Sequence, residues 1–269
     1  MIEARLAAGA LALALLGACA ATPPVPTAAR AELAPTGTLH AAINFGNPIL
    51  AAKDAATGEP RGVSVDLSRE LARRLGVPVQ FVLYDAAGKV VDAVKSGAWD
   101  VAYVAIDPAR AVDISYSGPY VVIEGAYLVQ QDSPIRSNAN VDREGVRVAV
   151  GKGSAYDLFL SRSLKHAKLV RAPTSPAVVG LFVAQKLDVA AGVKQQLEAD
   201  ARRTPGLRLL EGRFMVINQA MGTPRARGEA GARYLREFVE EMKASGFVAE
   251  ALQRHRIEGA SVGPKTPVE

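Results

Sequence analysis

The chain has 269 residues, of which 49% are hydrophobic and 22% charged; this length suffices for one large domain or two ordinary lobes, and the composition excludes a disordered chain. The formal net charge is +5, but Lys and Arg are scattered among Asp and Glu without a basic run. We therefore expect no nucleic-acid partner, and only a mild attraction for anionic solutes or membrane faces.

The N-terminal segment has the pattern of an export signal. The apolar run from Leu6 to Leu16 is too short to span a bilayer and suits the core of a signal peptide. It ends in Leu16-Gly17-Ala18-Cys19, which resembles the bacterial lipobox, whose cysteine is lipidated and becomes the mature N-terminus. Cys19 is the only cysteine, so no disulfide forms within the chain. We predict a lipoprotein signal peptide over residues 1–18 and lipidation of Cys19, with a plain secretory peptide as the alternative.

Residues 19–36 are rich in Ala, Pro and Thr without periodic apolar positions, which predicts a flexible tether. Strand and helix patterns alternate after it. The predicted strands of this first half are Leu39–Ile43, Val79–Leu83, Val101–Ile106 and Val121–Val129, and the predicted helices are Val63–Leu75 and Lys89–Ser96. This order predicts a mostly parallel sheet with crossover helices.

A polar stretch from Gln130 to Gly145 indicates a boundary, after which the alternation restarts. The predicted strands are Val146–Val150, Leu169–Arg171, Asp188–Val193, Leu207–Leu210 and Phe214–Met221. The predicted helices are a helix from Ser154 through Leu164, Ser175–Lys186, Lys194–Arg202, Glu229–Ser245 and Phe247–Arg256. Residues 259–269 are expected to form a disordered tail.

The two halves predict two α/β lobes joined by two hinge crossings. Lobe 1 is expected to comprise residues 37–129 and 222–258, and lobe 2 residues 130–221. Two crossings favour a hinge with a cleft between rigid bodies.

One cation lies just past a predicted buried strand. The strand Val101–Ile106 runs into Asp107-Pro108-Ala109-Arg110. Ligands of open α/β sheets bind outside the carboxyl ends of strands, and the planar fork of an arginine matches the two oxygens of a carboxylate. The alternative is a surface arginine in a turn capped by Asp107.

Taken in order, several segments resemble the bacterial extracellular solute-binding proteins of family 3, the polar amino-acid-binding type. The resemblance covers about Gly37 to Ile257. Its segments are Gly37-Thr38-Leu39, Gly58 to Leu67 (GEPRGVSVDL), Ser96 to Val101 (SGAWDV), Pro108-Ala109-Arg110, Tyr116 to Tyr120 (YSGPY), Val148 to Ser154 (VAVGKGS) and Lys186 to Val189 (KLDV).

This resemblance implies a two-lobed periplasmic-binding-protein fold of type II that hands a small solute to an ABC importer. It implies that Arg110 grips the carboxylate of the solute, and that backbone groups of Gly153, Ser154 and Ala155 meet the same carboxylate. The helix start at Ser154 agrees, because free N–H groups and the helix dipole favour an anion there. Ser154 is equally expected to cap its helix, and both roles are compatible.

Two departures from the family bear on the ligand. The family reaches its arginine through a longer, Ser/Thr-rich segment, whereas this chain has Val104-Ala105-Ile106-Asp107-Pro108. Members that bind α-amino acids carry an Asp for the ammonium, and the matching position here is Val193. A buried ammonium without an acceptor is costly. Either another carboxylate replaces that Asp, or the ligand is not an ordinary α-amino acid.

Two carboxylates are candidates for the replacement. Asp107 lies close to Arg110 in sequence, but Asp followed by Pro is also the pattern of a helix cap. Glu124 lies within an apolar run, where an ionised group needs a partner. It either holds a ligand cation, pairs with a neighbouring Lys or Arg, or faces water at a sheet edge.

Three further residues are candidate ligand contacts. Asn47 and Phe45 lie in the loop after the first strand, where the family has an aromatic that covers the ligand; Asn47-Pro48 is also a turn signal. Gln219, near the end of the last long strand, is expected at the return crossing.

We expect no cofactor, no metal site and no catalysis, because the three histidines are far apart and show no ligand spacing. The expected protein is a monomeric, lipid-anchored solute-binding protein of the periplasm, or of the cell surface in a Gram-positive source, with an ABC permease as partner. The alternatives are a lyase that resembles the cyclohexadienyl dehydratases, with Asp107 or Glu124 as general acid, and a sensory ligand-binding subunit.

Overall fold

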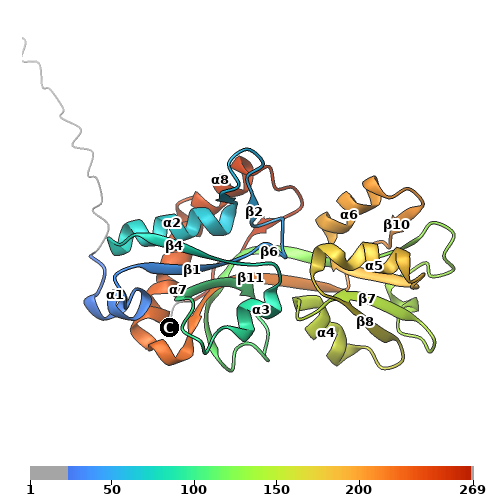
Figure 1. Cartoon of the computed structure of the whole chain (residues 1–269), viewed down its shortest axis with the longest axis horizontal. Helices are drawn as coiled ribbons and strands as arrows, with labels where there is room; N and C mark the ends of the chain where they lie inside the picture. The colour runs from blue at the N-terminus through green and yellow to red at the C-terminus, as the bar shows by residue number, and fades with distance from the viewer. Residues whose placement is uncertain (1–23, 268–269) are drawn as a thin grey trace, which may run out of the picture.

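Two α/β lobes lie side by side along the long axis of the computed structural model, which describes residues 24–267 (Figure 1). The helices are α1 (Thr27–Leu33), α2 (Val63–Leu75), α3 (Ala87–Asp92), α4 (Ala155–Ser163), α5 (Val178–Ala184), α6 (Lys194–Arg203), α7 (Glu229–Ala244) and α8 (Phe247–Arg254), with short 3-10 turns at Asn138–Asn140, Ser175–Ala177 and Arg225–Arg227. The strands are β1 (Leu39–Asn44), β2 (Ala52–Lys53), β3 (Pro60–Arg61), β4 (Val79–Tyr84), β5 (Val101–Ala105), β6 (Ile114–Gln130), β7 (Arg147–Gly151), β8 (Lys168–Ala172), β9 (Val189–Val193), β10 (Leu207–Leu209), β11 (Met215–Pro224) and β12 (Ser261–Val262).

One continuous sheet passes through both lobes, in the order β4-β1-β5-β11-β6-β9-β7-β8. The outer strands of each lobe are parallel, as predicted, because helical crossovers connect them. The two central strands, β6 and β11, run antiparallel to each other and to the outer strands beside them. The predicted α/β, two-lobed fold of type II is therefore confirmed.

The helices form where apolar periodicity and end signals agree. Helix α2 begins after Gly62, buries Val65, Leu67 and Leu71, and ends at Gly76 in the left-handed conformation. Its bounds are those predicted from the sequence. Position 62 requires glycine for two reasons. Its φ is +127°, which side chains disfavour, and a Cβ there would lie only 2.3 Å from the carbonyl oxygen of Leu50.

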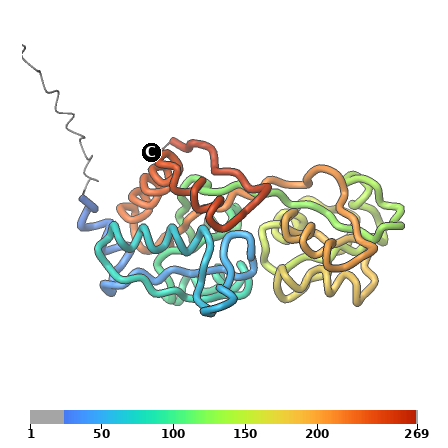
Figure 2. The backbone as a smooth tube through the Cα atoms, turned by 90° about the horizontal axis from the view of Figure 1, so that it is seen from above, coloured from blue at the N-terminus to red at the C-terminus, as the bar shows by residue number. Residues whose placement is uncertain are grey.

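Strands β6 and β11 connect the lobes. Strand β6 has 17 residues and is longer than the predicted Val121–Val129, because it begins in the turn that follows Arg110. It pairs with β9 of lobe 2 from Gly125 onward, while β11 pairs with β5 of lobe 1 from Gln219 onward. The chain thus changes lobe a few residues before each predicted boundary, and Figure 2 shows both crossings side by side.

The predicted tether is wrong over Thr27–Leu33, which forms α1. Ala29 and Leu33 are fully buried, and α1 packs against α7. The Glu32 carboxylate accepts a 2.6 Å hydrogen bond from the N–H of Gly231. The spacing of Ala29 and Leu33 gives this short helix an apolar face that lobe 1 covers. The predicted signal peptide and Cys19 lie outside the described residues.

The predicted disordered tail is also wrong, up to the last described residue. Strand β12 pairs with β6 at Val121 and Val122, on the edge that β9 occupies from Gly125 onward. Gly263 allows this approach, because a Cβ there would lie 1.8 Å from the carbonyl oxygen of Pro119. Lys243 then holds the next residue by a 2.6 Å hydrogen bond to the carbonyl of Pro264. An unpaired strand edge is stabilised by such a partner.

Among residues 24–267, no helix combines the length and apolar character needed to cross a bilayer.

Candidate functional site

Arg110 lies at the junction of the lobes, in the turn that follows β5. Its side chain is 2% exposed. One terminal nitrogen, Nη1, donates a 2.9 Å hydrogen bond to the carbonyl of Ala105 in its own lobe. The other, Nη2, donates a 2.7 Å hydrogen bond to the carbonyl of Gly153 in lobe 2. Arg110 therefore links the two lobes directly.

The guanidinium of Arg110 is not fully satisfied by these contacts. Its Nε–H is buried without a partner among the described residues. Burial lowers the pKa of the guanidinium, while nearby Tyr116 and Asp107 raise it. Arginine keeps its proton even so, so the site holds a buried positive charge whose direct partners are neutral carbonyls. Such a charge favours an anion.

Lobe 2 presents the start of α4 to the same place. The Ser154 hydroxyl caps the helix by accepting a hydrogen bond from the N–H of Asp157. The N–H of Gly153 is taken by the Asp157 carboxylate, and that of Ser154 by the carbonyl of Gly151. Of the three predicted backbone donors, only Ala155 keeps a free N–H.

Tyr156 supplies a second free N–H beside that of Ala155. The first N–H groups of a helix have no acceptor within it, and these two have none elsewhere in residues 24–267. Gly153 shapes this turn at φ +69°. The free N–H groups at the start of α4 are therefore those of Ala155 and Tyr156, of which only Ala155 was among the predicted donors.

A cavity with about 350 Å³ of empty space, part of it open to solvent, lies between Arg110 and the start of α4. It combines one cation with neutral polar and apolar walls. Its lining residues are Asn44, Gly46, Asn47, Ala87, Val104, Ala105, Arg110, Ser154, Ala155, Tyr156, Ser175, Val193, Ile217 and Gln219. In this arrangement the space left for water-sized molecules inside it is narrow, about 30 Å³.

The lobes touch beside this cavity, which makes the arrangement a closed one. Asp107 of lobe 1 pairs with Arg162 of α4 at 2.7 Å. Gly88 of α3 meets Gly153 backbone to backbone, and a Cβ on Gly153 would lie 2.8 Å from the Cα of Gly88. The two glycines are what allow the lobes to approach this closely.

The two candidate carboxylates are both committed to other groups. Asp107 accepts a 2.9 Å hydrogen bond from the N–H of Ala109, so it caps its turn in addition to pairing with Arg162. Glu124 lies on β6 between Arg213 at 2.6 Å and Lys194 at 3.5 Å, and Arg213 is the main cause of its lowered pKa. Neither lines the cavity. Of the three alternatives predicted for Glu124, the structure therefore shows the pairing with neighbouring basic residues.

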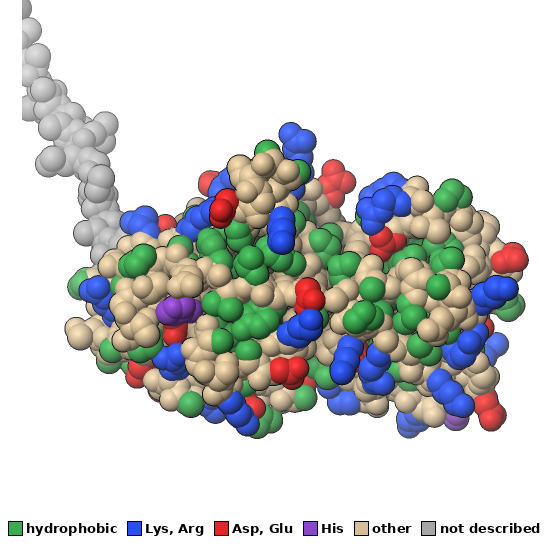
Figure 3. Space-filling view, viewed as in Figure 1, with side chains coloured by type: hydrophobic (Ala, Val, Ile, Leu, Met, Phe, Trp, Pro, Cys, Tyr) green, Lys and Arg blue, Asp and Glu red, His purple; other side chains and the backbone are tan. Residues whose placement is uncertain are grey.

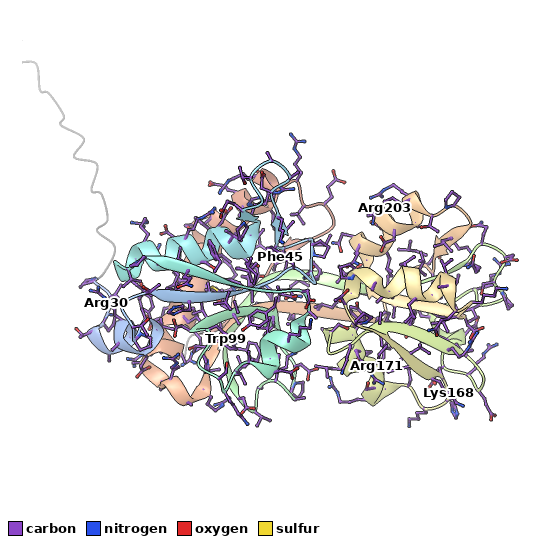
Figure 4. The ribbon with its side chains drawn as sticks, in the orientation of Figure 1. Arg30, Phe45, Trp99, Lys168, Arg171 and Arg203 are labelled. Atoms are coloured by element: carbon purple, nitrogen blue, oxygen red, sulfur yellow. The ribbon has the colours of Figure 1, made fainter. Side chains whose placement is uncertain are left out.

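Asn47 and Gln219 do line the cavity, and both are buried. The Oδ1 atom of Asn47 has no partner in the described part of the chain. Gln219 stands where the pairing of β11 with β6 shifts register, an irregularity that turns a side chain toward a site. Phe45 lies at the lobe junction but is not part of the lining (Figure 4). The Lys53 ammonium lies 5.8 Å from the centre of its ring.

Sequence reasoning did not single out Asn44, Tyr156, Ser175 or Ile217 as site residues. Asn44 follows β1 and accepts a 2.9 Å hydrogen bond from the N–H of Gly46, which shapes the loop before Asn47. Burial raises the pKa of the Tyr156 phenol, and its hydrogen bonds to Ser175 and Ser154 oppose this. Asn44 could have been predicted, because it is a polar residue at the end of a strand. No feature of the sequence indicates Ile217.

The face drawn in Figure 3 carries charges of both signs. On the face drawn in Figure 3, basic side chains are interspersed with acidic and hydrophobic ones. In the described part of the chain, no group of three or more His, Cys, Asp or Glu side chains has an arrangement that would hold a metal ion.

Solved structures with this fold include several kinds of protein. A solute receptor for L-cysteine of Neisseria gonorrhoeae has a TM-score of 0.74 and 21% identity, over 87% of this chain and 95% of its own. The ancestral amino acid-binding protein AncCDT-1, described as a precursor of cyclohexadienyl dehydratase, has a TM-score of 0.70 and 21% identity, over 84% and 98%. A histidine kinase sensor domain similar to periplasmic binding proteins has a TM-score of 0.71 and 21% identity, over 84% and 98%.

At these identities the structural likeness establishes the fold alone. The sequence itself matches the model of one family from residue 41 to residue 257, which is most of the chain. The chain therefore belongs to the bacterial extracellular solute-binding proteins, family 3.

Proposed function

We propose that this protein binds a small carboxylate-bearing solute between its lobes and delivers it to an ABC importer. The observation that carries the proposal is Arg110, buried at the lobe junction with an unpartnered Nε–H beside the cavity. A carboxylate that meets Nε and a terminal nitrogen forms two parallel hydrogen bonds and neutralises the buried charge. The free N–H groups of Ala155 and Tyr156 supply donors from the other lobe.

Because hydrogen-bond donors lie on both lobes, a bound solute stabilises the closed form of the protein. A ligand shifts an open–closed equilibrium only by its differential affinity for the two states. Arg110 and Asn47 belong to lobe 1, whereas Ala155 and Tyr156 belong to lobe 2. An anion that contacts both sets binds the closed form more tightly, and a permease that recognises the closed form receives loaded protein.

Export and anchoring follow from the N-terminal pattern. Family members are extracellular or periplasmic solute-binding proteins. Lipidation at Cys19 would hold the monomeric protein at a membrane surface beside its permease. A lyase has less support, because Asp107 and Glu124 are both ion-paired and outside the cavity lining. A sensory protein would bind its solute in the same way. The two roles differ in the partner of the closed protein, which is a permease for an importer and a membrane receptor for a sensor.

Calorimetric titration tests the binding step. A panel of small carboxylates is titrated into the wild-type protein and into Arg110→Ala. We expect at least one acid to bind the wild type, and the variant to bind it at least about thirtyfold more weakly, since truncating one partner of a buried charge pair costs about 2–5 kcal/mol. Affinity unchanged in Arg110→Ala contradicts the proposal.

Arg208→Ala is the matched control. Arg208 also donates to backbone carbonyls, those of Ser133 and Ile135, but it lies outside the cavity lining. We expect it to retain wild-type affinity. Uptake of the same labelled acid by cells that carry either the wild-type or the Arg110→Ala protein then tests delivery. Equal uptake by the two kinds of cell contradicts the importer assignment.

A further inference from the structure

The charge of the cavity lining limits the class of solute. Of the residues from 24 to 267 that line it, Arg110 alone is charged. The other polar groups are neutral: the amides of Asn44, Asn47 and Gln219 and the hydroxyls of Ser154, Tyr156 and Ser175. A carboxylate bound to Arg110 would bring the site to electrical neutrality. An ammonium added to the same solute would leave one uncompensated positive charge.

Two buried carboxylates close in sequence to lining residues, Asp107 and Asp157, are held by other cations. Asp107 pairs with Arg162 at 2.7 Å, and Asp157 pairs with Arg171 at 3.0 Å while it also accepts the N–H of Gly153. Both side chains are buried and neither lines the cavity. An ammonium in the cavity would therefore have to break one of these pairs or remain without a counter-charge, and both are costly.

The wall at Val193 is apolar. Val193 is 6% exposed, lines the cavity and precedes α6 as its cap residue. Val104 and Ile217 add further apolar surface. An isopropyl group desolvates an ammonium without offering an acceptor, whereas it packs well against a methyl or methylene group.

Asn47 supplies one neutral acceptor. Its buried Oδ1 has no partner among residues 24–267, which leaves a lone pair for a donor on the solute. A hydroxyl satisfies a neutral amide with one hydrogen bond and brings no charge. An ammonium would use the same contact for one of its three N–H groups and retain its charge.

From this balance we propose that the solute is a small hydroxycarboxylate, an acid with a hydroxyl in place of an ammonium. The inference rests on the proposed function, since it takes the carboxylate contact at Arg110 as given, and it names the class of solute for that contact. Arg110 holds the carboxylate, Asn47 accepts the hydroxyl, and Val193 excludes the ammonium.

Matched pairs of acids test the proposal on the full, wild-type protein. The probes are two pairs of monocarboxylates, L-lactate with L-alanine and D-glycerate with D-serine, each measured by calorimetry. We expect the tightest-binding probe to be a hydroxy acid that exceeds its amino partner in affinity by at least about tenfold, which is 1.4 kcal/mol. An amino acid that binds as tightly as its hydroxy partner overturns the proposal. If that amino acid also loses binding in Arg110→Ala, the proposed function stands and only this inference fails. If none of these probes binds, this inference fails; the proposed function fails with it only if no acid of the wider panel binds.

Val193→Asp provides a second measurement. Its carboxylate would supply the missing counter-charge, so we expect the affinity ratio of amino acid to hydroxy acid to rise at least about tenfold. Val193→Asn is the matched control, since it adds a polar group of similar size without charge, and the ratio should change far less. An Asp variant that folds and leaves the ratio unchanged overturns the role given to Val193. If Val193→Asp does not fold, the wild-type pairs still decide.

Discussion

Arg110 and Asp100 are two buried charges of opposite sign in the same lobe, and their surroundings differ. Asp100 is 1% exposed, and its carboxylate accepts hydrogen bonds from both the backbone N–H and the ring of His40, at 2.8 and 3.0 Å. Arg227 completes the set at 2.8 Å. Arg110 is equally buried, yet its direct partners are two carbonyls, and its Nε–H has no partner in the described part of the chain.

The difference separates a structural charge from a binding charge. A fully partnered carboxylate within one lobe stabilises the fold, because removing it leaves its partners unpaired. A cation placed between lobes with an unmet donor favours an external anion at some cost to the empty protein. Substitution at Asp100 should therefore change stability, and substitution at Arg110 should change binding.

The largest effect on stability is expected for Asp100→Ala. We expect the free energy of unfolding to fall by about 2–4 kcal/mol, somewhat below the cost of breaking a fully buried pair, because His40 and Arg227 each remain about a quarter exposed. Urea denaturation measures the change. The affinity of the folded variant for the acid should stay within about threefold of wild type, a difference of under 0.7 kcal/mol. A loss of affinity with unchanged stability would reverse the comparison.

Arg110→Lys sharpens the comparison by keeping the charge and removing the fork. An ammonium does not make the two parallel hydrogen bonds of a guanidinium, so we expect affinity to weaken by about tenfold, or 1.4 kcal/mol, against the larger loss in Arg110→Ala. Calorimetry on both variants gives the ratio. Equal losses in the two would mean that charge contributes nothing, and wild-type affinity in the Lys variant would mean that the fork contributes nothing.

The pair of Asp107 with Arg162 should have a smaller effect. It joins the lobes, but Arg162 is about half exposed. A double-mutant cycle with Asp107→Asn and Arg162→Ala should give a coupling of about 0.5–1 kcal/mol in ligand affinity, through a shift of the lobes toward the open form. Small-angle scattering of the unliganded protein should show a larger radius of gyration in both single variants. An unchanged radius of gyration would show that this pair does not hold the lobes in the closed arrangement.

Asp142 provides an exposed counterpart of the partnered carboxylate. It accepts hydrogen bonds from the N–H groups of Lys165, His166 and Ala167, which lower its pKa to about 2. Because the folded pKa lies below the ordinary value of 3.8, its contribution to stability is full above pH 4 and is lost as the pH falls toward 2. Asp142→Ala should remove part of the acid-induced loss of stability over that window. An identical pH profile would contradict this.

The smallest effect is expected for Glu124→Gln. Glu124 pairs with Arg213 and Lys194 at the surface, and such pairs contribute about 0.2–1 kcal/mol to stability. Ligand affinity should not change, because Glu124 does not line the cavity. A loss of affinity of about tenfold or more in Glu124→Gln would restore it as a ligand contact.

The sequence predicted the features that depend on local pattern. Helix α2 has apolar spacing and a glycine at each end, and Arg110 follows a buried strand. The start of α4 at Ser154 also has a local signal, since Ser is a preferred cap. These are the features through which the fold and the main candidate residue were found.

The features that the sequence did not predict depend on contacts between distant residues. Asp107 meets Arg162, which is 55 positions away, and that contact occupies its carboxylate in this arrangement. The tail pairs with β6 only because the edge is open there and Gly263 admits it. Helix α1 had the right spacing at Ala29 and Leu33, but its stability comes from α7, as a seven-residue helix gains little from propensity alone.

The most direct test of the carboxylate contact is the proton–nitrogen NMR signal of the Arg110 Nε–H. Its assignment follows from its loss in Arg110→Lys. On addition of the tightest-binding acid of the panel, we predict that this signal moves downfield and becomes protected from exchange with water, because the unpartnered donor gains a charged acceptor. A signal that stays unchanged at saturating acid, while binding is measured by calorimetry, would contradict the role given to Arg110.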